Sequence, residues 1–486
     1  MIPRRLFAVT AISALVFGAV MHAEPRPDLK ETANQLAASI YTGPSMGTLR
    51  QLSDDFGGRL SGSPAYNRAA DWAAAQFRSY GISNVRFEPF TMENGWVRGS
   101  AQGHITAPMA RPLHIQSLGW SPSTPSGGVK GEVLVVDDVS PDHVKSLGNQ
   151  PKGKIIAYDL DKIFAHGWTT ALPQMEATYQ RFKDAGATGL LFPDRENDQV
   201  LNAFSPDWGS RLCVLPAAQV GMEDWELMQR LAEKGPVSIQ FELQNTTTGP
   251  MQVNNIVAEI KGTDHPDEWI IIGAHFDSWD YGTGAQDNGT GSAMVLEAAR
   301  AIAALGKAPQ RTIRFALWGG EEEGILGSYA YTQAHAAEMA KCVAVLNTDN
   351  GSGHPKGWKV EGRPDLETAM KPISDGLLEN LSGGGLSEEV TYDTDHGPFM
   401  LQGVPALDLW VDGSHYGEVH HKSSDTYDKV DPLFLKADAA IVAVTAWAIA
   451  EDPNRIAPRL DHAAVAAILK KASLDQLLVS VGQWKP

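Results

Sequence analysis

The chain has few cysteines. Among its 486 residues only Cys213 and Cys342 carry a thiol. A disulfide between them would suit an exported protein. Both residues, however, fall on apolar, strand-like segments that we assign to different domains. We therefore expect two buried thiols rather than a disulfide.

Basic residues are also scarce relative to acidic ones. The chain has 40 Lys and Arg against 58 Asp and Glu, which gives a formal net charge of −18. Nucleic-acid binding depends on a basic excess that releases counterions, so we expect no nucleic-acid partner. The same deficit argues against docking on an anionic membrane surface. The sequence contains no charged tail and no repeat of fixed period.

The one long apolar run at the N-terminus has the pattern of a secretory signal. Arg4 and Arg5 precede an apolar stretch over residues 6–20, and small residues follow as far as Ala23. This stretch is short for a membrane-spanning helix, although an N-terminal anchor is the alternative. We therefore expect residues 1–23 to be removed, and the mature protein to be exported (periplasmic or secreted) without a membrane span.

Length and composition indicate two globular domains. A chain of 486 residues with 43% hydrophobic content exceeds one ordinary domain. A stretch rich in Gly, Pro and Ser, GWSPSTPSGGVKG, marks a boundary after about residue 117. We expect a smaller α/β domain over residues 120–236, inserted into a larger domain of residues 24–119 and 237–486. The alternative is an elaborated loop region of one larger domain.

An apolar run, Ile270–Ile272, predicts a buried strand at the centre of the larger domain. The strand leads into a polar, glycine-rich loop, and a helix begins after this loop near Thr290. The strand end and the loop carry three side chains that can ligate metals or titrate: His275, Asp277 and Asp287.

A second strand is predicted over Thr312–Trp318, and three glutamates follow it: Glu321, Glu322 and Glu323. Ligands of open α/β sheets bind outside the carboxyl ends of the strands. Histidine with carboxylates is a ligand set for zinc, and the number of carboxylates suggests two ions. Alone, the His-x-Asp pair would indicate a surface turn and the glutamates a solvated helix start. Their placement at successive strand ends favours a metal site.

The order of three motifs, HFD, QDN and GEEEGILGS, resembles the co-catalytic zinc exopeptidases, the family of leucyl aminopeptidases, glutamate carboxypeptidases and carboxypeptidase Q. The stretch SWDYGTGAQDNGTGSAMVLEAARAI is most similar to the carboxypeptidase Q branch. The resemblance implies an α/β fold with a doubly wound mixed sheet flanked by helices. It also implies that the inserted region is a protease-associated domain, of which KDAGATGLLFP is the most telling part.

The resemblance implies two further ligands, an aspartate after the next strand and a histidine near the end of the chain. Asp349 follows an apolar strand over residues 342–346. In the segment HHKSSDTYD, the second histidine, His421, fits the family's register, and the first is its nearest competitor. Three residues are expected beside the substrate: His420, Asp395 and His396.

The family's pattern then assigns the ligands of two zinc ions. His275 and Asp349 would hold one ion, Glu322 and His421 would hold the other, and Asp287 would bridge them. Two such ions share a water and lower its pKa.

Two acidic residues receive roles without binding metal. Asp277 would fix the tautomer of His275 by accepting its other ring N–H. Glu321 would be the general base that takes a proton from the bridging water. The resemblance also implies a cis peptide bond between Asp287 and Asn288. Glutamate carboxypeptidases have a tyrosine before the last histidine ligand, whereas this chain has His420, so the group that stabilises the oxyanion stays open.

These inferences predict an exported dizinc exopeptidase, an aminopeptidase or carboxypeptidase Q-like dipeptidase, acting on dipeptides or short peptides. Two alternatives share the fold: a glutaminyl-cyclase-like acyltransferase with one zinc, and a non-catalytic receptor-like relative. The presence of all five ligands and the base favours the hydrolase. The letters GPSMG match a serine-hydrolase motif but follow no clear strand.

The scarcity of arginine also bears on which end of the substrate is recognised. No Arg lies between Asp365 and Lys436, where the pocket is expected, so a clamp for a substrate carboxylate is lacking. We therefore expect neutral, unblocked dipeptides to be preferred. A homodimer is an open possibility. The α-amine of such a substrate needs a carboxylate, for which the candidates are Asp395, Asp412, Glu418 and Glu323.

Overall fold

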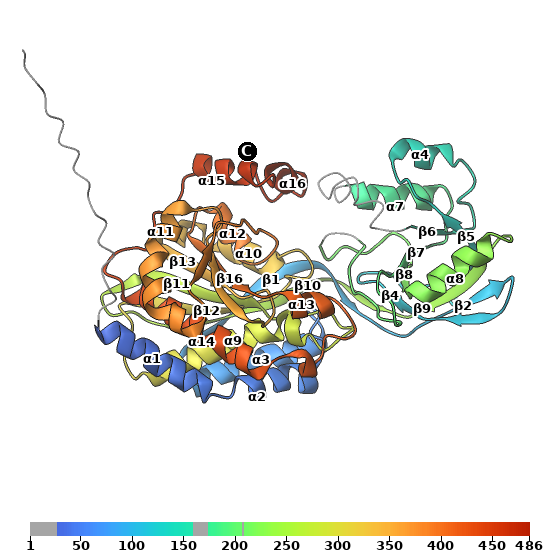
Figure 1. Ribbon diagram of the computed structural model, residues 1–486. Helices are drawn as coiled ribbons and strands as arrows, with labels where there is room; N and C mark the ends of the chain where they lie inside the picture. Colours follow the sequence, from blue (N-terminus) through green and yellow to red (C-terminus); the bar gives the residue numbers. More distant parts are fainter. Residues whose placement is uncertain (1–26, 159–173, 207–208) are drawn as a thin grey trace, which may run out of the picture.

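The computed structural model describes residues 27–158, 174–206 and 209–486, so the predicted secretory signal lies outside the described residues. Two lobes are present, each built on one eight-stranded sheet (Figure 1). The strand order of the larger lobe is β1-β10-β12-β11-β13-β16-β14-β15. The bounds are β1 (Asn84–Val97), β10 (Thr246–Ile260), β11 (His265–His275), β12 (Arg311–Trp318), β13 (Cys342–Asn347), β14 (Pro355–Lys359), β15 (Gly385–Ser387) and β16 (Ala406–Val411).

Four parallel strands, β12, β11, β13 and β16, form the centre of this sheet. They are apolar on both faces because helices cover both; Ile270, Ile271 and Ile272 are completely buried. In the register, His275 lies opposite Trp318 and Gly273 lies opposite Asn347. The carboxyl ends of these strands therefore meet at one edge of the sheet.

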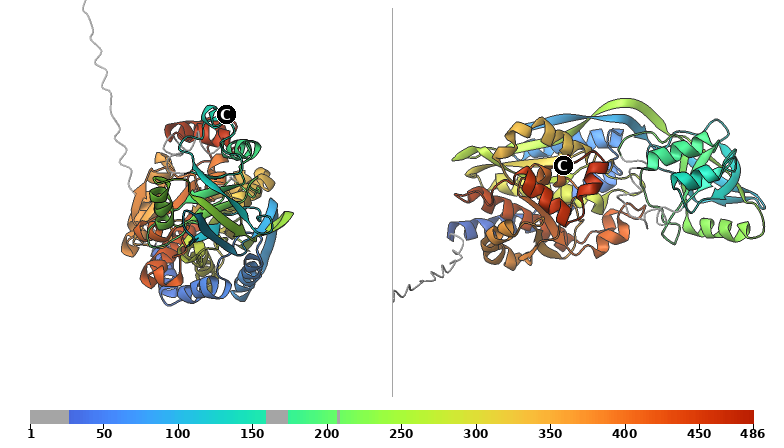
Figure 2. Two further views of the ribbon diagram at one scale, coloured as in Figure 1. Left: turned by 90° about the vertical axis from the view of Figure 1, so that its right-hand side faces the viewer. Right: turned by 90° about the horizontal axis from the view of Figure 1, so that it is seen from above.

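Helices cover the two faces of the larger sheet (Figures 1 and 2). One face packs against α1 (Pro27–Tyr41), α3 (Pro64–Ser79), α9 (Thr290–Ala304) and α14 (Pro432–Glu451). The other packs against α10 (Leu326–Ala334), α12 (Gly397–Leu401) and α15 (His462–Lys471). Helix α3 begins at a Ser-Pro pair, and the Ser63 side chain accepts the main-chain N–H of Tyr66.

Helix α14 is the one helix among the described residues that is long and apolar enough to cross a membrane. Its apolar window is 83% buried inside the lobe. The helix contacts α1 and α9, and Ile441 and Trp447 belong to the same hydrophobic cluster as the strands. This burial identifies α14 as a core helix.

The smaller lobe is formed by residues between the two long strands β1 and β10. Its strand order is β3-β2-β9-β5-β6-β7-β8-β4, and it has its own apolar clusters. The strands reach from residue 101 to residue 243, beyond the expected interval of 120–236 on both sides. The bounds are β2 (Ala101–Ala107), β3 (Arg111–Leu113), β4 (Ile115–Ser117), β5 (Val129–Val135), β6 (Ile155–Ala157), β7 (Gly189–Pro193), β8 (Ala217–Val220) and β9 (Ser238–Leu243), with helices α4 (Pro141–Ser146), α7 (Met175–Asp184) and α8 (Met222–Ala232).

The fold class predicted from the sequence, a mixed α/β sheet flanked by helices, is confirmed. The prediction of two buried thiols is also confirmed, since both Cys213 and Cys342 are buried and neither forms a disulfide. The identification of the smaller lobe as a protease-associated domain stays a proposal.

Candidate metal centre and active site

His275, Asp287 and Asp349 converge at the carboxyl edge of the larger sheet. Nε2 of His275 lies 3.0 Å from Oδ1 of Asp349 and 3.1 Å from Oδ1 of Asp287. His275 is the last residue of β11, and Asp349 follows the end of the neighbouring strand β13. The sheet therefore fixes two of these three side chains relative to each other.

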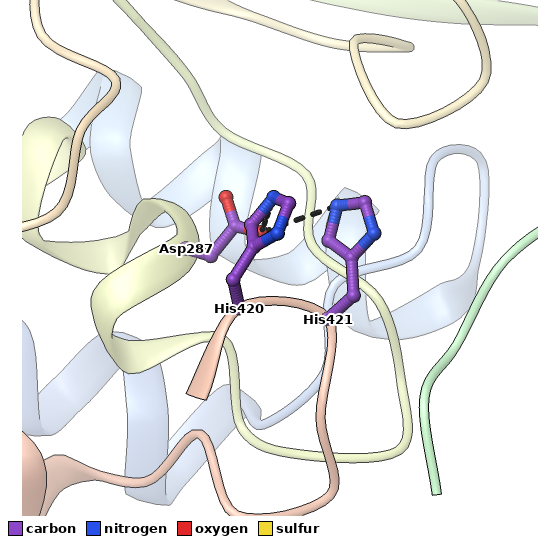
Figure 3. A group of neighbouring side chains, drawn as sticks. All are labelled: Asp287, His420 and His421. Atoms are coloured by element: carbon purple, nitrogen blue, oxygen red, sulfur yellow. Dashed lines mark ion pairs between the residues drawn. The ribbon is translucent and has the colours of Figure 1, made fainter. Parts of the chain in front are cut away.

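A second group meets the other oxygen of Asp287. Nε2 of His421 lies 3.4 Å from Oδ2 of Asp287 and 3.0 Å from Oε2 of Glu322. Nε2 of His420 is farther from Asp287, at 3.7 Å, and it has no such contact with Glu322. Figure 3 shows the two imidazoles beside each other, with Asp287 facing them. These distances favour His421 over His420 as the partner of Glu322.

The donor set fits divalent cations. Oδ2 of Asp287 accepts no hydrogen bond from the described residues, although the side chain is only 4% exposed. Burial raises the pKa of Glu322 well above its usual range, and the neighbouring charge of Asp287 raises it further. Burial opposes protonation of His275, yet Asp349 and Asp287 raise its pKa well above the ordinary value. A cation between these side chains would relieve the repulsion between their carboxylates. Imidazole and carboxylate groups are ligands that suit zinc.

Asp277 contacts His275 differently from the expectation. Nδ1 of His275 lies 3.1 Å from the carbonyl oxygen of Asp277, whereas the carboxylate Oδ1 is 3.8 Å away. The carboxylate instead accepts the main-chain N–H groups of Glu321 and Glu322, at 3.4 and 3.2 Å. The carbonyl thus orients the imidazole, and the carboxylate positions the turn that carries the two glutamates.

The bridging position of Asp287 depends on two further residues, to whose side chains the sequence assigned no role. The Asp425 carboxylate accepts the main-chain N–H groups of Gln286 (2.8 Å) and Asp287 (3.1 Å). Asn288 donates to Oδ1 of Asp349 at 3.1 Å and to the Thr348 carbonyl at 2.7 Å. The Asp287–Asn288 peptide bond is cis, as the resemblance implied.

Arg59 is a further residue that sequence reasoning missed. It is completely buried, and its guanidinium donates to main-chain carbonyls on both sides of the metal loop. These include Phe276 at 3.0 Å, Thr283 at 3.1 Å and Gly284 at 2.9 Å. One rigid donor group therefore holds both ends of the loop between His275 and Asp287. No local sequence signal marks this role, because the contacts span more than 200 residues.

A cavity of about 750 Å³ opens onto the metal centre. Glu321 lines it together with four of the candidate ligands, Asp287, Glu322, Asp349 and His421. His420 and Tyr416 lie on the same wall. Burial raises the pKa of Glu321 well above its usual range, and Asp349 contributes to the shift. A raised pKa makes a carboxylate a stronger base than an ordinary glutamate.

Two residues expected beside the substrate do not line this cavity. Asp395 is 1% exposed and accepts a hydrogen bond from Ser328, and His396 is completely buried with Nε2 2.6 Å from the Thr391 carbonyl. The four carboxylates considered for the α-amine are also absent from the described lining, whereas the exposed Asp393 is part of it. The sequence does not show which of these residues are buried and which line the cavity, because that depends on contacts between distant parts of the chain.

The sequence is similar to a known protein family and to several of its members. Residues 255–446 match peptidase family M28. Carboxypeptidase Q of Mus musculus is 31% identical over 436 residues, which cover 88% of this chain and 90% of the relative. Carboxypeptidase Q of Xenopus laevis is 30% identical over 412 residues, covering 84% and 85%.

Solved structures agree with the sequence matches. The peptidase M28 precursor of Shewanella amazonensis superposes with a TM-score of 0.77 at 30% identity, covering 89% of this chain and 99% of that structure. The zinc aminopeptidase of Bacillus subtilis shares the fold, with a TM-score of 0.64 at 20% identity, and covers 86% and 97%.

Proposed function

This chain belongs to peptidase family M28, and from that premise we propose that it is an exported, zinc-dependent exopeptidase. Its substrates would be neutral, unblocked dipeptides or short peptides. The observation that carries the proposal is the position of Asp287, whose two carboxylate oxygens face two separate ligand groups. His275 and Asp349 form one group, and Glu322 and His421 form the other.

The names of the relatives support both the exopeptidase activity and the dependence on zinc. Carboxypeptidase Q and zinc aminopeptidase each describe removal of terminal residues, and the second name states the metal. The presence of both ligand groups supports a two-metal hydrolase over a one-zinc acyltransferase of the glutaminyl cyclase type. The presence of both ligand groups also disfavours a receptor-like relative without activity.

Two zinc ions, when bound, would polarise the scissile carbonyl and lower the pKa of a shared water. Glu321 is the residue of this chain that moves the proton. It lines the cavity next to Glu322, and its raised pKa allows it to take a proton from the attacking water and return it to the leaving amine. His420 and Tyr416 lie on the wall of the cavity near His421, where either can donate a hydrogen bond to the substrate's carbonyl oxygen.

The charges around the cavity support a preference for an unblocked α-amine. Among the described lining residues Lys359 is the only lysine or arginine, and its ammonium lies 3.5 Å from Glu389. Lys359 also lies opposite Asp408 in the strand register, and its positive charge acts to lower the pKa of that carboxyl. Asp393 is exposed on the same wall, where it can hold a positively charged amine. A cavity of this charge disfavours acidic substrate residues.

An apolar wall completes the cavity. Helix α16 (Asp475–Ser480) and the turns around it place Leu474, Leu477 and Val481 on the lining. Leu478 and Trp484 are buried in the larger lobe and anchor this segment. A neutral, apolar side chain of the substrate would bury its surface against this wall.

The test compares one neutral dipeptide with its N-acetylated and C-amidated forms. We expect fast hydrolysis of the unblocked dipeptide, which a chelator abolishes and added zinc restores. The N-acetylated form should be a poor substrate, because it cannot offer a charged amine. Faster cleavage of the acetylated form, with the amide inert, would reveal carboxypeptidase recognition and overturn the proposed polarity.

A further inference from the structure

A short segment of the smaller lobe pairs with the loop that carries His421. The main-chain N–H of Ala203 donates to the carbonyl of His421 at 2.6 Å. Two residues later, the N–H of Ser423 donates to the carbonyl of Leu201 at 3.0 Å. A residue of the metal centre is therefore held through its own main chain by the other lobe.

Side chains reinforce this junction. Asn202 and Lys422 face each other in an isolated antiparallel bridge. The Lys422 ammonium lies 2.9 Å from Oε1 of Glu196 and also donates to the carbonyls of Gly417 and Glu418. One ammonium thus ties the smaller lobe to the helix that leads into the histidine pair.

Asp194 organises the pairing segment within the smaller lobe. Its carboxylate accepts the main-chain N–H groups of Glu196 (3.0 Å) and Asn202 (2.7 Å), and the side-chain amide of Asn202 (2.7 Å). Asp194 follows the end of β7, is 3% exposed, and its own N–H donates to the Val220 carbonyl. We call residues 194–204 the Asp194 segment.

The backbone of His421 needs such support. Its φ is +58°, in the left-handed region that residues other than glycine rarely adopt. Conformations of this kind persist only where surrounding contacts determine them. The hydrogen bond from Ala203 holds the carbonyl of His421 itself, and the bond from Ser423 to Leu201 holds the chain two residues later.

The smaller lobe also contacts the other metal loop. The Trp279 ring packs edge-on against Trp120 of the smaller lobe, with centroids 6.4 Å apart, and lies 6.1 Å from the His421 ring. Tyr281 donates to the Ser117 carbonyl at 2.7 Å. Both loops that would enclose the second metal position are thus in contact with this lobe.

We propose that the Asp194 segment is a positioning element for the metal position formed by Glu322 and His421. The smaller lobe holds His421 in its left-handed conformation, and this sets the affinity of that position for zinc. The proposal rests on the proposed function, because it requires metal at these residues. Asp194 is a positioning residue and contacts neither metal nor substrate.

The principal test measures zinc affinity in Asp194→Asn. This change replaces one of the two acceptor oxygens by an NH2 group. The main-chain N–H groups of Glu196 and Asn202 bond to different oxygens of Asp194, so the variant cannot accept both. We expect one of the two zinc ions to bind roughly tenfold more weakly, the low end for groups that orient ligands, while the other is unchanged. Asp142→Asn, at an exposed position in α4 of the same lobe, is the matched control and should retain both affinities. A folded Asp194→Asn protein with two unchanged affinities would overturn the proposal.

A second measurement needs no variant. Because coupling between sites is reciprocal, zinc at His421 should stabilise the pairing. Amide hydrogen exchange in residues 199–204 should therefore slow when zinc is added to chelated wild-type protein, whereas α7 should be unaffected. Equal exchange with and without two bound zinc ions would contradict the inference. Wild-type protein that binds no zinc would instead contradict the proposed function.

Discussion

The carboxylate of Asp425 accepts the main-chain N–H of Asp287 at 3.1 Å and so holds the bridging residue from behind. It also accepts the N–H of Gln286, so both of its oxygens are used. Burial raises the pKa of Asp425 to about 7, which shows how costly this carboxylate is to keep charged. Asp425 is therefore a buried residue that helps to fix the geometry of the candidate metal centre.

Replacing Asp425 by Asn should weaken both metal positions. The NH2 group of the amide would face one of these two main-chain N–H groups and leave it without an acceptor, so the Asp287 loop would lose part of its orientation. We expect zinc affinity and turnover to fall by about 10- to 100-fold, the range for groups that orient ligands. The control is Asp428→Asn, at an exposed position of the same loop, where the carboxylate accepts hydrogen bonds from Thr426 and Lys429. Full zinc affinity in Asp425→Asn would contradict this role.

Glu321→Gln should abolish turnover while both zinc ions stay bound. Gln cannot accept a proton, so the loss in kcat should exceed about 100-fold, the low end for a general acid–base group. Glu322→Gln should instead lose the zinc ion shared with His421. Metal analysis and steady-state kinetics on the two variants separate the roles. An active Glu321→Gln together with an inactive, fully metallated Glu322→Gln would mean that base and ligand are exchanged.

Leu477→Ala should reduce the preference for large apolar substrates. The wall formed by α16 would lose several methyl and methylene groups, each worth about 0.8 kcal/mol when buried. We expect kcat/KM for a leucine-containing dipeptide to fall roughly tenfold relative to a glycine-containing one, with zinc content unchanged. Leu433→Ala is a matched control, because Leu433 is 68% exposed and does not line the cavity. An unchanged ratio of the two substrates would exclude α16 from substrate selection.

Export remains a prediction from the sequence alone. The pattern over residues 4–23 leads us to expect that the mature protein begins near Glu24. N-terminal sequencing of protein isolated from its own cells tests this. A cytoplasmic protein that still begins at Met1 would contradict it.

The sequence predicted that these candidate ligands would meet because strand ends are local features. His275 and Asp349 each follow an apolar run, and parallel neighbours bring such ends together whatever the loops do. Asp287, Glu322 and His421 were placed by their motifs, and the structure brings all five side chains into contact.

The remainder of the site could not be predicted because it depends on tertiary contacts. Arg59 and Asp425 bind main-chain groups far away in the chain, and the sequence gives no sign of these contacts. Asp395 and His396 were expected beside the substrate, yet folding buries them beneath the cavity wall. The wall from α16 depends on how the end of the chain packs over the larger sheet.

The central claim is that Asp287 bridges two zinc ions that are essential for peptide hydrolysis. Elemental analysis of freshly purified protein, combined with dipeptide hydrolysis before and after chelation, tests it most directly. We predict two zinc ions per chain, loss of activity in parallel with their removal, and recovery when zinc is restored. Full activity in metal-free protein, or full activity with one ion per chain, would contradict the claim.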